Sequence, residues 1–378
     1  MMELDEQLRE AGERWRETQR APVADFRRAT RRSSRRSREP GRSRGLLAAP
    51  ILIGAFLLAV AVVAVVNSTS SSQKVTVTQP TAPISAAPAS PSVLMLRPDI
   101  VQTGGLAIDS ATVWVTGYAP DEGPATLEHI DTKTGQVLGT VKLPDNSPFQ
   151  IVVGDGAVWI CSQQNEEAAR LIKVDPATTK VTAVIPTQGD ANVALTPDAL
   201  WVAVNTGILE RRDPDTNRVL ATITMPGGPY SAHFVTAGPL GIFLASTYDG
   251  SVLRVDPVAN TVTQIADLGD NAGPLVELDG SLWVRAGTGV VAIDPATGAI
   301  TRRIARDVRD LASDGRSLWA STNGPTVLRI DPQTGAVTTR PLAHDVHFAI
   351  ALAGDPATGA VWAASDPSST RRLFRVSP

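Results

Sequence analysis

TVLRIDPQTGAV, residues 326–337, is an apolar run that ends in an Asp-Pro pair and continues through Thr-Gly into a second apolar run. Pro presets its own φ, Asp hydrogen-bonds its own backbone and Gly accepts a positive φ, so the segment predicts a β-hairpin. Similar runs occur at six places, Asp131, Asp175, Asp213, Asp256, Asp294 and Asp331, with Thr in place of Pro after Asp131 and other residues in place of Thr-Gly in three of them. Because these residues suit a tight turn, we expect them to be structural rather than catalytic or ligand-binding.

A second repeated feature is a short apolar run centred on an aromatic residue, such as AVWICS at 157–162. Its seven copies are centred on Trp114, Trp159, Trp201, Phe243, Trp283, Trp319 and Trp362. Successive copies are 36 to 45 residues apart, a period typical of a propeller blade made of four antiparallel strands. In each blade we expect the aromatic run to be the second strand and the run ending in Asp to be the third.

The seventh copy, 348–378, ends at RRLFRVSP and supplies only three strands. SVLMLRP at 92–98 resembles the fourth-strand runs of other copies, such as QVLGTVKLP at 136–144. An N-terminal strand that completes the last blade closes the ring and removes an unpaired edge. Residues 92–378 are 287 residues, or about 41 per copy. The sequence therefore predicts an all-β fold, a seven-bladed β-propeller over 92–378 closed by its N-terminal strand.

The segment before the propeller has a different composition. Residues 46–66 are 21 residues without a charge, long enough as a helix to cross a bilayer. The preceding flank, 26–45, carries nine Arg and one Glu, which predicts that the N-terminus lies in the cytoplasm and the propeller outside. A cleaved signal peptide is the alternative, but its apolar region is usually shorter. Residues 67–91, rich in Ser, Thr, Pro and Ala, predict a solvated linker.

Residues 1–45 form an Arg-rich cytoplasmic segment in this interpretation, with 13 Arg against 8 acidic residues. The Arg-rich flank is expected to contact anionic lipid headgroups. Leu4, Leu8, Ala11 and Trp15 share one face of a short predicted helix over 3–19. The chain has 30 Arg against 5 Lys, which suggests a GC-rich bacterial genome, so we expect a single-pass protein of the bacterial cytoplasmic membrane. Cys161 is the only cysteine, and an intrachain disulfide is therefore excluded.

The repeated Trp-Val and Asp-Pro-x-Thr-Gly blades resemble the bacterial YVTN-type, YncE-like propellers and, more distantly, virginiamycin B lyase and NHL-repeat proteins. The resemblance covers residues 92–378 and implies the propeller fold. It implies little about activity, because one propeller architecture carries binding, scaffolding and catalysis.

The lyase relatives imply a His and Glu cluster that holds a divalent metal at the channel. His233 and Glu277 are the candidates in this chain, since they lie on the predicted inner strands of neighbouring blades and a His with a carboxylate can bind a metal or move a proton. The second His and second Glu of the lyase pattern are missing from the matching places. Nucleophilic triads and phosphate-binding Gly loops are also absent, and no basic aromatic face suggests nucleic acid as a partner.

An acidic residue recurs in the connections between one predicted blade and the next, at Asp99, Asp145, Asp190, Asp270, Asp307 and Asp345. Such connections share one face of a propeller, so these carboxylates are expected to surround the channel mouth and give it a negative field. Asn192, Tyr230 and Asn271 are expected to assist them in binding a cation, with calcium as the ion that oxygen ligands favour, or a positively charged ligand. The alternative is that Asp and Asn simply suit tight turns.

Three classes of function follow from these features. The first is a membrane-anchored, extracytoplasmic propeller that binds a protein, glycan or envelope component without turnover. The second is a propeller enzyme of the lyase type that uses His233 and Glu277. The third is a transmembrane sensor whose cytoplasmic segment docks a partner. The sequence favours the non-catalytic binding module.

Overall fold

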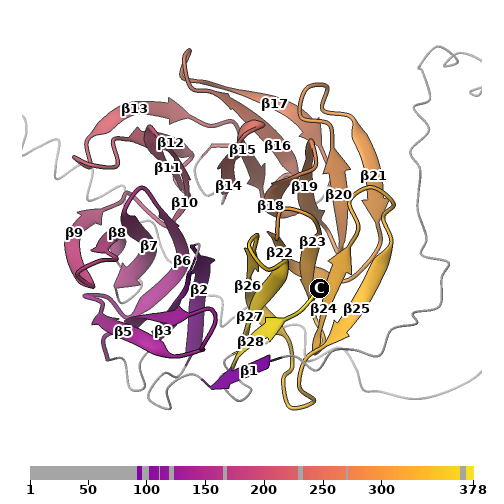
Figure 1. Ribbon diagram of the computed structural model, residues 1–378. Coiled ribbons are helices and arrows are strands. Elements are labelled where there is room, and N and C mark those ends of the chain that lie inside the picture. The colour runs from indigo at the N-terminus through magenta and orange to yellow at the C-terminus, as the bar shows by residue number, and fades with distance from the viewer. Residues whose placement is uncertain are drawn as a thin grey trace, which may run out of the picture. The chain divides into compact units, whose positions relative to one another are not determined.

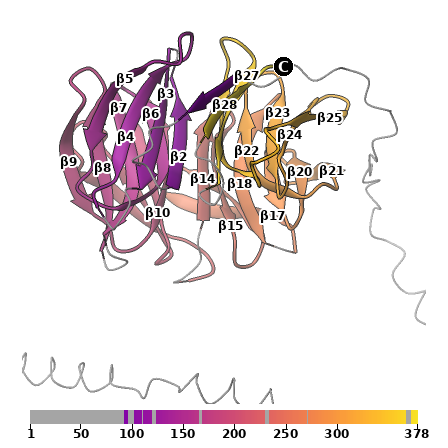
Figure 2. The same ribbon diagram turned by 90° about the horizontal axis from the view of Figure 1, so that it is seen from below.

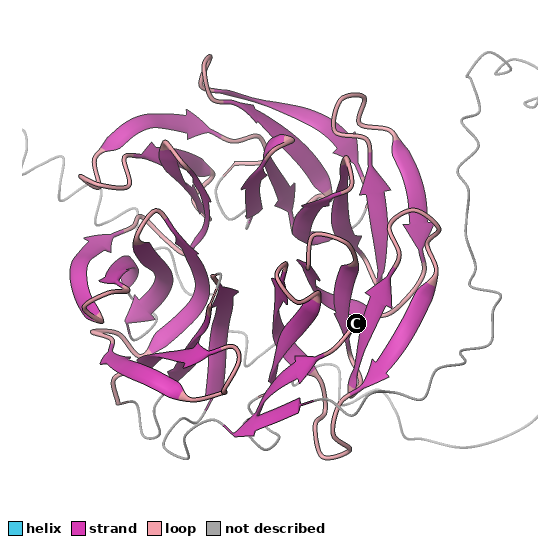
Figure 3. Cartoon of the chain, in the orientation of Figure 1, coloured by secondary structure: helices cyan, strands magenta, loops and turns pink. Residues whose placement is uncertain are grey.

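The computed structural model describes residues 92–95, 102–109, 111–118, 123–164, 168–228, 233–269, 271–366 and 372–378. These residues belong to one compact unit of the chain and form seven four-stranded antiparallel sheets arranged as a ring (Figures 1 and 3). Figure 2 views the ring from the side and shows the strands running across its thickness. The predicted seven-bladed, all-β propeller is therefore confirmed.

Each of the first four blades contains four consecutive strands, which follow one another from the inside of the ring outward. Blade 1 has Gln102–Ile108 (β2), Thr112–Tyr118 (β3), Thr126–Asp131 (β4) and Val137–Lys142 (β5). Blade 2 has Ser147–Gly154 (β6), Ala157–Gln164 (β7), Ala168–Asp175 (β8) and Lys180–Pro186 (β9). Blade 3 has Ala191–Thr196 (β10), Ala199–Val204 (β11), Ile208–Arg212 (β12) and Val219–Thr224 (β13). Blade 4 has His233–Gly238 (β14), Gly241–Ser246 (β15), Ser251–Asp256 (β16) and Thr261–Asp267 (β17).

The remaining three blades complete the ring. Blade 5 has Ala272–Leu278 (β18), Ser281–Ala286 (β19), Gly289–Ile293 (β20) and Ile300–Ile304 (β21). Blade 6 has Val308–Ser313 (β22), Leu318–Thr322 (β23), Thr326–Ile330 (β24) and Val337–Pro341 (β25). Blade 7 has Ala349–Asp355 (β26), Ala360–Ser365 (β27), Arg372–Val376 (β28) and Ser92–Met95 (β1).

The outermost strand of blade 7 comes from the beginning of the propeller sequence. β1 pairs antiparallel with β28, with Ser92 opposite Arg375 and Met95 opposite Arg372. The inner strands also meet without a break, because β26 contacts β2 just as each inner strand contacts the next. Trp362 of blade 7 packs with Leu106 and Val113 of blade 1, so blades 7 and 1 share a hydrophobic core as well.

The aromatic run is the second strand of every blade, as the repeat predicts. All seven aromatic side chains are fully buried, and each lies in a hydrophobic cluster that combines residues of its own blade with residues of the following one. Trp201 of blade 3, for example, shares its cluster with Leu244 and Leu253 of blade 4. The aromatic repeat therefore builds the seven inter-blade cores.

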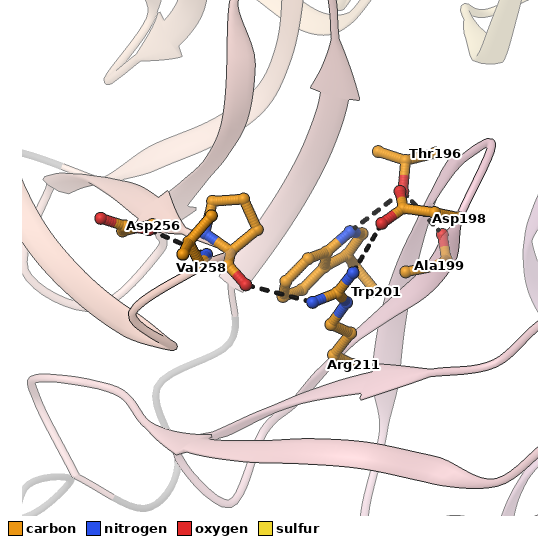
Figure 4. Close-up of polar contacts among 8 residues, drawn as sticks. Thr196, Asp198, Ala199, Trp201, Arg211, Asp256 and Val258 are labelled. Atoms are coloured by element: carbon orange, nitrogen blue, oxygen red, sulfur yellow. Dashed lines mark hydrogen bonds and ion pairs between the residues drawn. The ribbon is translucent and has the colours of Figure 1, made fainter.

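A cation on the third strand extends this packing to the next blade (Figure 4). Arg211 lies over the Trp201 ring, 5.7 Å from its centroid, and donates hydrogen bonds to Asp198 at 2.5 Å and to the Pro257 carbonyl at 3.1 Å. Lys173 of blade 2 repeats the arrangement on Trp159 and on the carbonyl of Pro214. The Pro carbonyl of an Asp-Pro turn is thus an acceptor for the preceding blade.

The Asp-Pro turns have the predicted local geometry. In all six, the Asp Oδ1 accepts backbone N–H groups two and three residues ahead, as in Asp331 with Gln333 at 2.8 Å and Thr334 at 2.9 Å. Hydrogen bonds of this kind lower the pKa of these turn carboxyls. Gly335 takes φ 74°, while Asn217 takes φ 62° at the same place in blade 3. These contacts are local and support the structural interpretation of the motif.

Several predictions fall outside the described residues. The cytoplasmic segment 1–45, the membrane span 46–66 and the linker 67–91 are among them. Within the part of the chain that the structure describes, no helix has the length and apolarity needed to cross a membrane.

Candidate functional site

The centre of the ring contains a cavity of about 790 Å³. Its lining comes from the first residues of the inner strands and from the turns after the second strands, including Gly287, Thr288 and Asn323. Both sets of residues lie on the same face, because each inner strand runs away from this face and the second strand returns to it. We call it the entry face, since the connections from the preceding blades enter the inner strands there.

The inner strands of five blades are irregular where they line this cavity. The pairing of the inner with the second strand shifts register in blades 1, 2, 5, 6 and 7. The residues skipped by these shifts are Gly104, Gly105, Phe149, Gly273, Pro274, Arg309, Asp310 and Ile350, and all but Gly273 line the cavity. Such irregularities re-aim side chains, so they determine which groups reach the cavity.

The cavity has one charged wall, formed by blades 5 and 6. Arg285, Asp307, Arg309 and Asp310 line it there. The lining from blades 1, 2, 4 and 7 is largely apolar and includes Leu106, Phe149, Ile151, Phe234 and Ile350. The arrangement can bind a ligand that has a polar group at one end and an apolar body.

Arg309 is held at the entry face by an amide and an aromatic ring. Its guanidinium lies 4.0 Å from the centroid of the Phe348 ring, and its Nη1 donates to Asn323 Oδ1 at 2.8 Å. Asn323 in turn donates from Nδ2 to Asp307 Oδ1 at 2.6 Å. Asn323 therefore lies between the cation and the nearest recurrent carboxylate of blade 6.

Arg285 is held by oxygen atoms of its own blade. It donates to Asn271 Oδ1 at 3.0 Å and to the Gly287 carbonyl at 3.1 Å. A Cβ at Gly273 would lie 2.2 Å from the Arg285 Nε atom, so glycine at 273 makes room for the guanidinium.

Asp310 is a half-buried acid whose carboxylate is surrounded by protein. It accepts the backbone N–H of Leu352 in blade 7 at 2.9 Å and that of Leu311 at 2.9 Å. Burial raises the pKa of Asp310 to about 6, and these hydrogen bonds and the charge of Arg285 only partly oppose it. A group with a perturbed pKa in a concave site is a candidate for function.

Four of the six predicted mouth carboxylates lie within the described residues, and of these four only Asp307 lines the cavity. Asp145 is fully buried and pairs with Arg170 at 3.0 Å, and burial raises its pKa although Arg170 opposes the shift. Asp345 pairs with Arg372 at 2.7 Å, and Asp190 accepts a hydrogen bond from Gln163. Two of these carboxylates are thus already neutralised by arginine.

The other predicted residues of the mouth have mixed positions. Asn192 lines the cavity and Asn271 holds Arg285, whereas Asp99, Tyr230 and Asp270 lie outside the described residues. Across the described ranges no group of three or more His, Cys, Asp or Glu has the geometry to hold a metal ion.

His233 and Glu277 are not brought together. His233 begins β14 at the entry face, opposite Ser246, and the equivalent first residue of β18 is Ala272. Glu277 lies five positions further along β18, roughly 15 Å away at the rise of a strand. Its Oε2 accepts the Leu240 backbone N–H at 2.8 Å, and burial raises its pKa. Glu277 therefore stabilises the inner turn of blade 4 on the opposite face.

Arg309, Asp310, Asn323 and Phe348 were not predicted from the sequence as site residues. The signal available was the run ARDVRD at 305–310, which places charges where most other copies begin their inner strand with small or apolar residues. Periodicity alone does not reveal which of these charges face the channel, because the register shift decides it.

No protein-family model matches the chain, and no curated protein matches it. Among solved structures, the hydrazine synthase of Kuenenia stuttgartiensis is similar, with a TM-score of 0.61 and 14% sequence identity. The match covers 74% of this chain and 97% of that chain. At this identity the similarity shows a shared β-propeller fold and carries no statement about activity.

Proposed function

We propose that the protein is an extracytoplasmic ligand-binding propeller that holds its ligand in the central cavity, at the entry face, without chemical turnover. The observation that supports this most is the division of the cavity into a charged wall from blades 5 and 6 and a largely apolar lining from blades 1, 2, 4 and 7. Its volume of about 790 Å³ falls within the usual size range of small-molecule sites.

A binding role is favoured over a catalytic one by the candidate reactive groups. His233 and Glu277, the pair expected for a lyase, lie at opposite ends of the inner strands. Cys161 is buried, and burial raises the pKa of its thiol, which makes it a poor nucleophile at neutral pH.

The proposal places the propeller outside the bacterial cytoplasmic membrane. Residues 46–66 form the anchor, residues 67–91 act as a tether, and the Arg-rich flank contacts anionic lipids on the cytoplasmic side. The ligand then comes from outside the cell or from the envelope. It is a small molecule, or a group carried by a protein or a glycan. The kinship with YVTN-type, YncE-like propellers belongs to the same proposal and rests on the repeated motifs.

The pairing of β1 with β28 closes the ring in this proposal, because β1 supplies the fourth strand of blade 7. The tether reaches the propeller at Ser92–Met95, so the strand that receives any pull from the membrane is also the outermost strand of blade 7. An antiparallel strand held by backbone hydrogen bonds suits this position, because the bonds act together when the chain is pulled along the strand.

Blocking the entry face tests the proposed function. Thr288 is exposed and lines the cavity, so Thr288→Trp should fill its mouth, whereas Thr263→Trp adds the same bulk to exposed β17 on the rim. The full-length protein in detergent is screened by thermal shift against small carboxylates, phosphates, sugars and amines. A shift that Thr288→Trp abolishes and Thr263→Trp retains is expected. Equal shifts in both variants, or none in the unaltered protein, would reject the cavity as a binding site.

A further inference from the structure

We propose that the cavity recognises its ligand through an anionic group, a carboxylate in the first place, which binds to Arg309 with Arg285 as the second cation. The inference rests on the proposed function and specifies the chemistry of the ligand: a small organic anion with an apolar body. The cation that the sequence predicts at the mouth is the alternative to this proposal.

The surroundings of Arg309 distinguish it from four other arginines of the propeller. Arg170, Arg211, Arg212 and Arg372 each form an ion pair with a carboxylate. Arg309 forms none with any residue that the structure describes, and one of its N–H groups donates to an amide oxygen. A guanidinium has five donors in a planar fork that matches a carboxylate. Arg309 therefore keeps donors for a ligand.

Phe348 and Asn323 orient this guanidinium. Stacking over the Phe348 ring at 4.0 Å fixes the plane of the fork, and the hydrogen bond to Asn323 fixes its rotation within that plane. Ordering an exposed Arg before binding reduces the conformational entropy that the ligand must overcome. Asn323 also binds Asp307, so an amide separates Arg309 from the acid that would otherwise neutralise it.

Arg285 brings a second positive charge from the neighbouring blade. It lines the same cavity, and its charge acts on Asp310, the residue next to Arg309. Its guanidinium fits against Gly273, where any side chain would collide with it. Two cations from adjacent blades thus converge on the charged wall.

The rest of the cavity sets the other properties of the ligand. Asp307 and Asp310 stand in the same wall, so the wall offers no large excess of positive charge and favours a monoanion over a polyanion. Phe234 of blade 4 and Ile350 of blade 7, on either side of this wall, and Phe149 of blade 2, across the cavity, provide apolar contacts. An aromatic or aliphatic carboxylate satisfies both walls, and benzoate with its neutral counterpart benzamide is a suitable pair of probes.

Equilibrium dialysis of the full-length protein in detergent measures this preference. Benzoate is expected to bind more tightly than benzamide. Arg309→Gln should weaken benzoate about tenfold or more, the usual effect of losing a hydrogen bond to a charged group. Arg316→Gln is the matched control, because exposed Arg316 lies on the same blade in the turn between β22 and β23, away from the cavity, and should change affinity less than twofold.

A second variant tests the inference without removing an arginine. Asn323→Asp supplies a carboxylate partner for Arg309 and replaces the donor to Asp307 with a negative charge. Both changes should lower benzoate affinity. Unchanged melting temperatures show that the variants are folded. Equal affinity for benzoate and benzamide, or equal losses in Arg309→Gln and Arg316→Gln, would overturn the anion assignment while binding blocked by Thr288→Trp keeps the proposed function. Benzoate binding that Thr288→Trp does not affect would contradict both.

Discussion

Replacing the Asp310 carboxylate with an amide should stabilise the protein at neutral pH. Asp310 accepts backbone N–H groups from Leu352 and Leu311. At the corresponding position of blade 2, Gln150 makes the same kind of bridge with an amide, accepting from the Val193 N–H at 2.7 Å and donating to its carbonyl. Asp310→Asn keeps an acceptor for a neighbouring N–H and removes the charge.

The size of the effect follows from the pKa of Asp310. Its rise from 3.8 to about 6 means that the folded state holds the proton more tightly than the unfolded chain. Protonated Asp310 therefore contributes to the free energy of unfolding, fully below pH 3.8. This contribution, at most about 3 kcal/mol, is lost as the pH rises through 6. Since the residue is only half-buried, we expect about 2 kcal/mol above pH 7, or roughly 4–8 °C in melting temperature.

The assay is thermal unfolding of the full-length protein, followed by Trp fluorescence, at pH 4.5, 6 and 8. The difference between Asp310→Asn and the unaltered protein should grow in favour of the variant as pH rises. Asp294→Asn is a control of opposite sign, because turn hydrogen bonds lower the pKa of Asp294, so this variant should lose stability towards neutral pH. A difference for Asp310→Asn that stays constant with pH would refute the reasoning.

Three further predictions concern the closure, the topology and the mouth. Replacing Ser92–Met95 with Gly-Ser-Gly-Ser should lower the melting temperature by roughly 5–10 °C, because Gly is unfavourable in a strand and weakens the pairing of β1 with β28, which is worth about three or four ladder hydrogen bonds. An unchanged melting curve would show that β1 does not stabilise the ring. Protease added to spheroplasts should digest the propeller and spare residues 1–45, and a protected propeller would reverse the proposed orientation. Millimolar calcium should raise the melting temperature if the mouth carboxylates bind it. The rise should vanish in the triple variant Asp190→Asn, Asp270→Asn, Asp307→Asn. It should persist in Asp145→Asn, because the Asp145 carboxylate already pairs with Arg170. If calcium does not raise the melting temperature of the unaltered protein, these residues are turn formers only.

The blade architecture could be predicted because its determinants are local and repeated. The aromatic slot and the Asp-Pro turn recur from copy to copy, and each acts within a hairpin or against the next copy, so spacing alone assigns the second strand and the turn that follows the third. Phe243 takes the place of Trp in the fourth blade and is equally buried, which shows that the slot requires a large apolar ring rather than Trp itself.

The site could be predicted only in part from the sequence, because the residues that form it do not recur with the blade period. Arg309 and Asp310 reach the cavity through a register shift in β22, which interrupts the alternation that predicts side-chain direction. Asp145 and Asp345 pair with Arg170 and Arg372, which lie 25 and 27 residues further along the chain. The spacing of the acidic residues cannot reveal such partners. His233 and Glu277 are 44 residues apart, close to one blade period, which suggests equivalent positions on neighbouring inner strands. The strand pairing instead places them near opposite ends of these strands.

The most direct test of a ligand site at the charged wall is a structure of the protein bound to 4-bromobenzoate, with the bromine located by its anomalous scattering. The account predicts a bromine position among the apolar residues of the central cavity, with the carboxylate within hydrogen-bonding distance of the Arg309 guanidinium. Bromine found only on the rim or the opposite face, or a carboxylate in the cavity that contacts neither Arg309 nor Arg285, would contradict it.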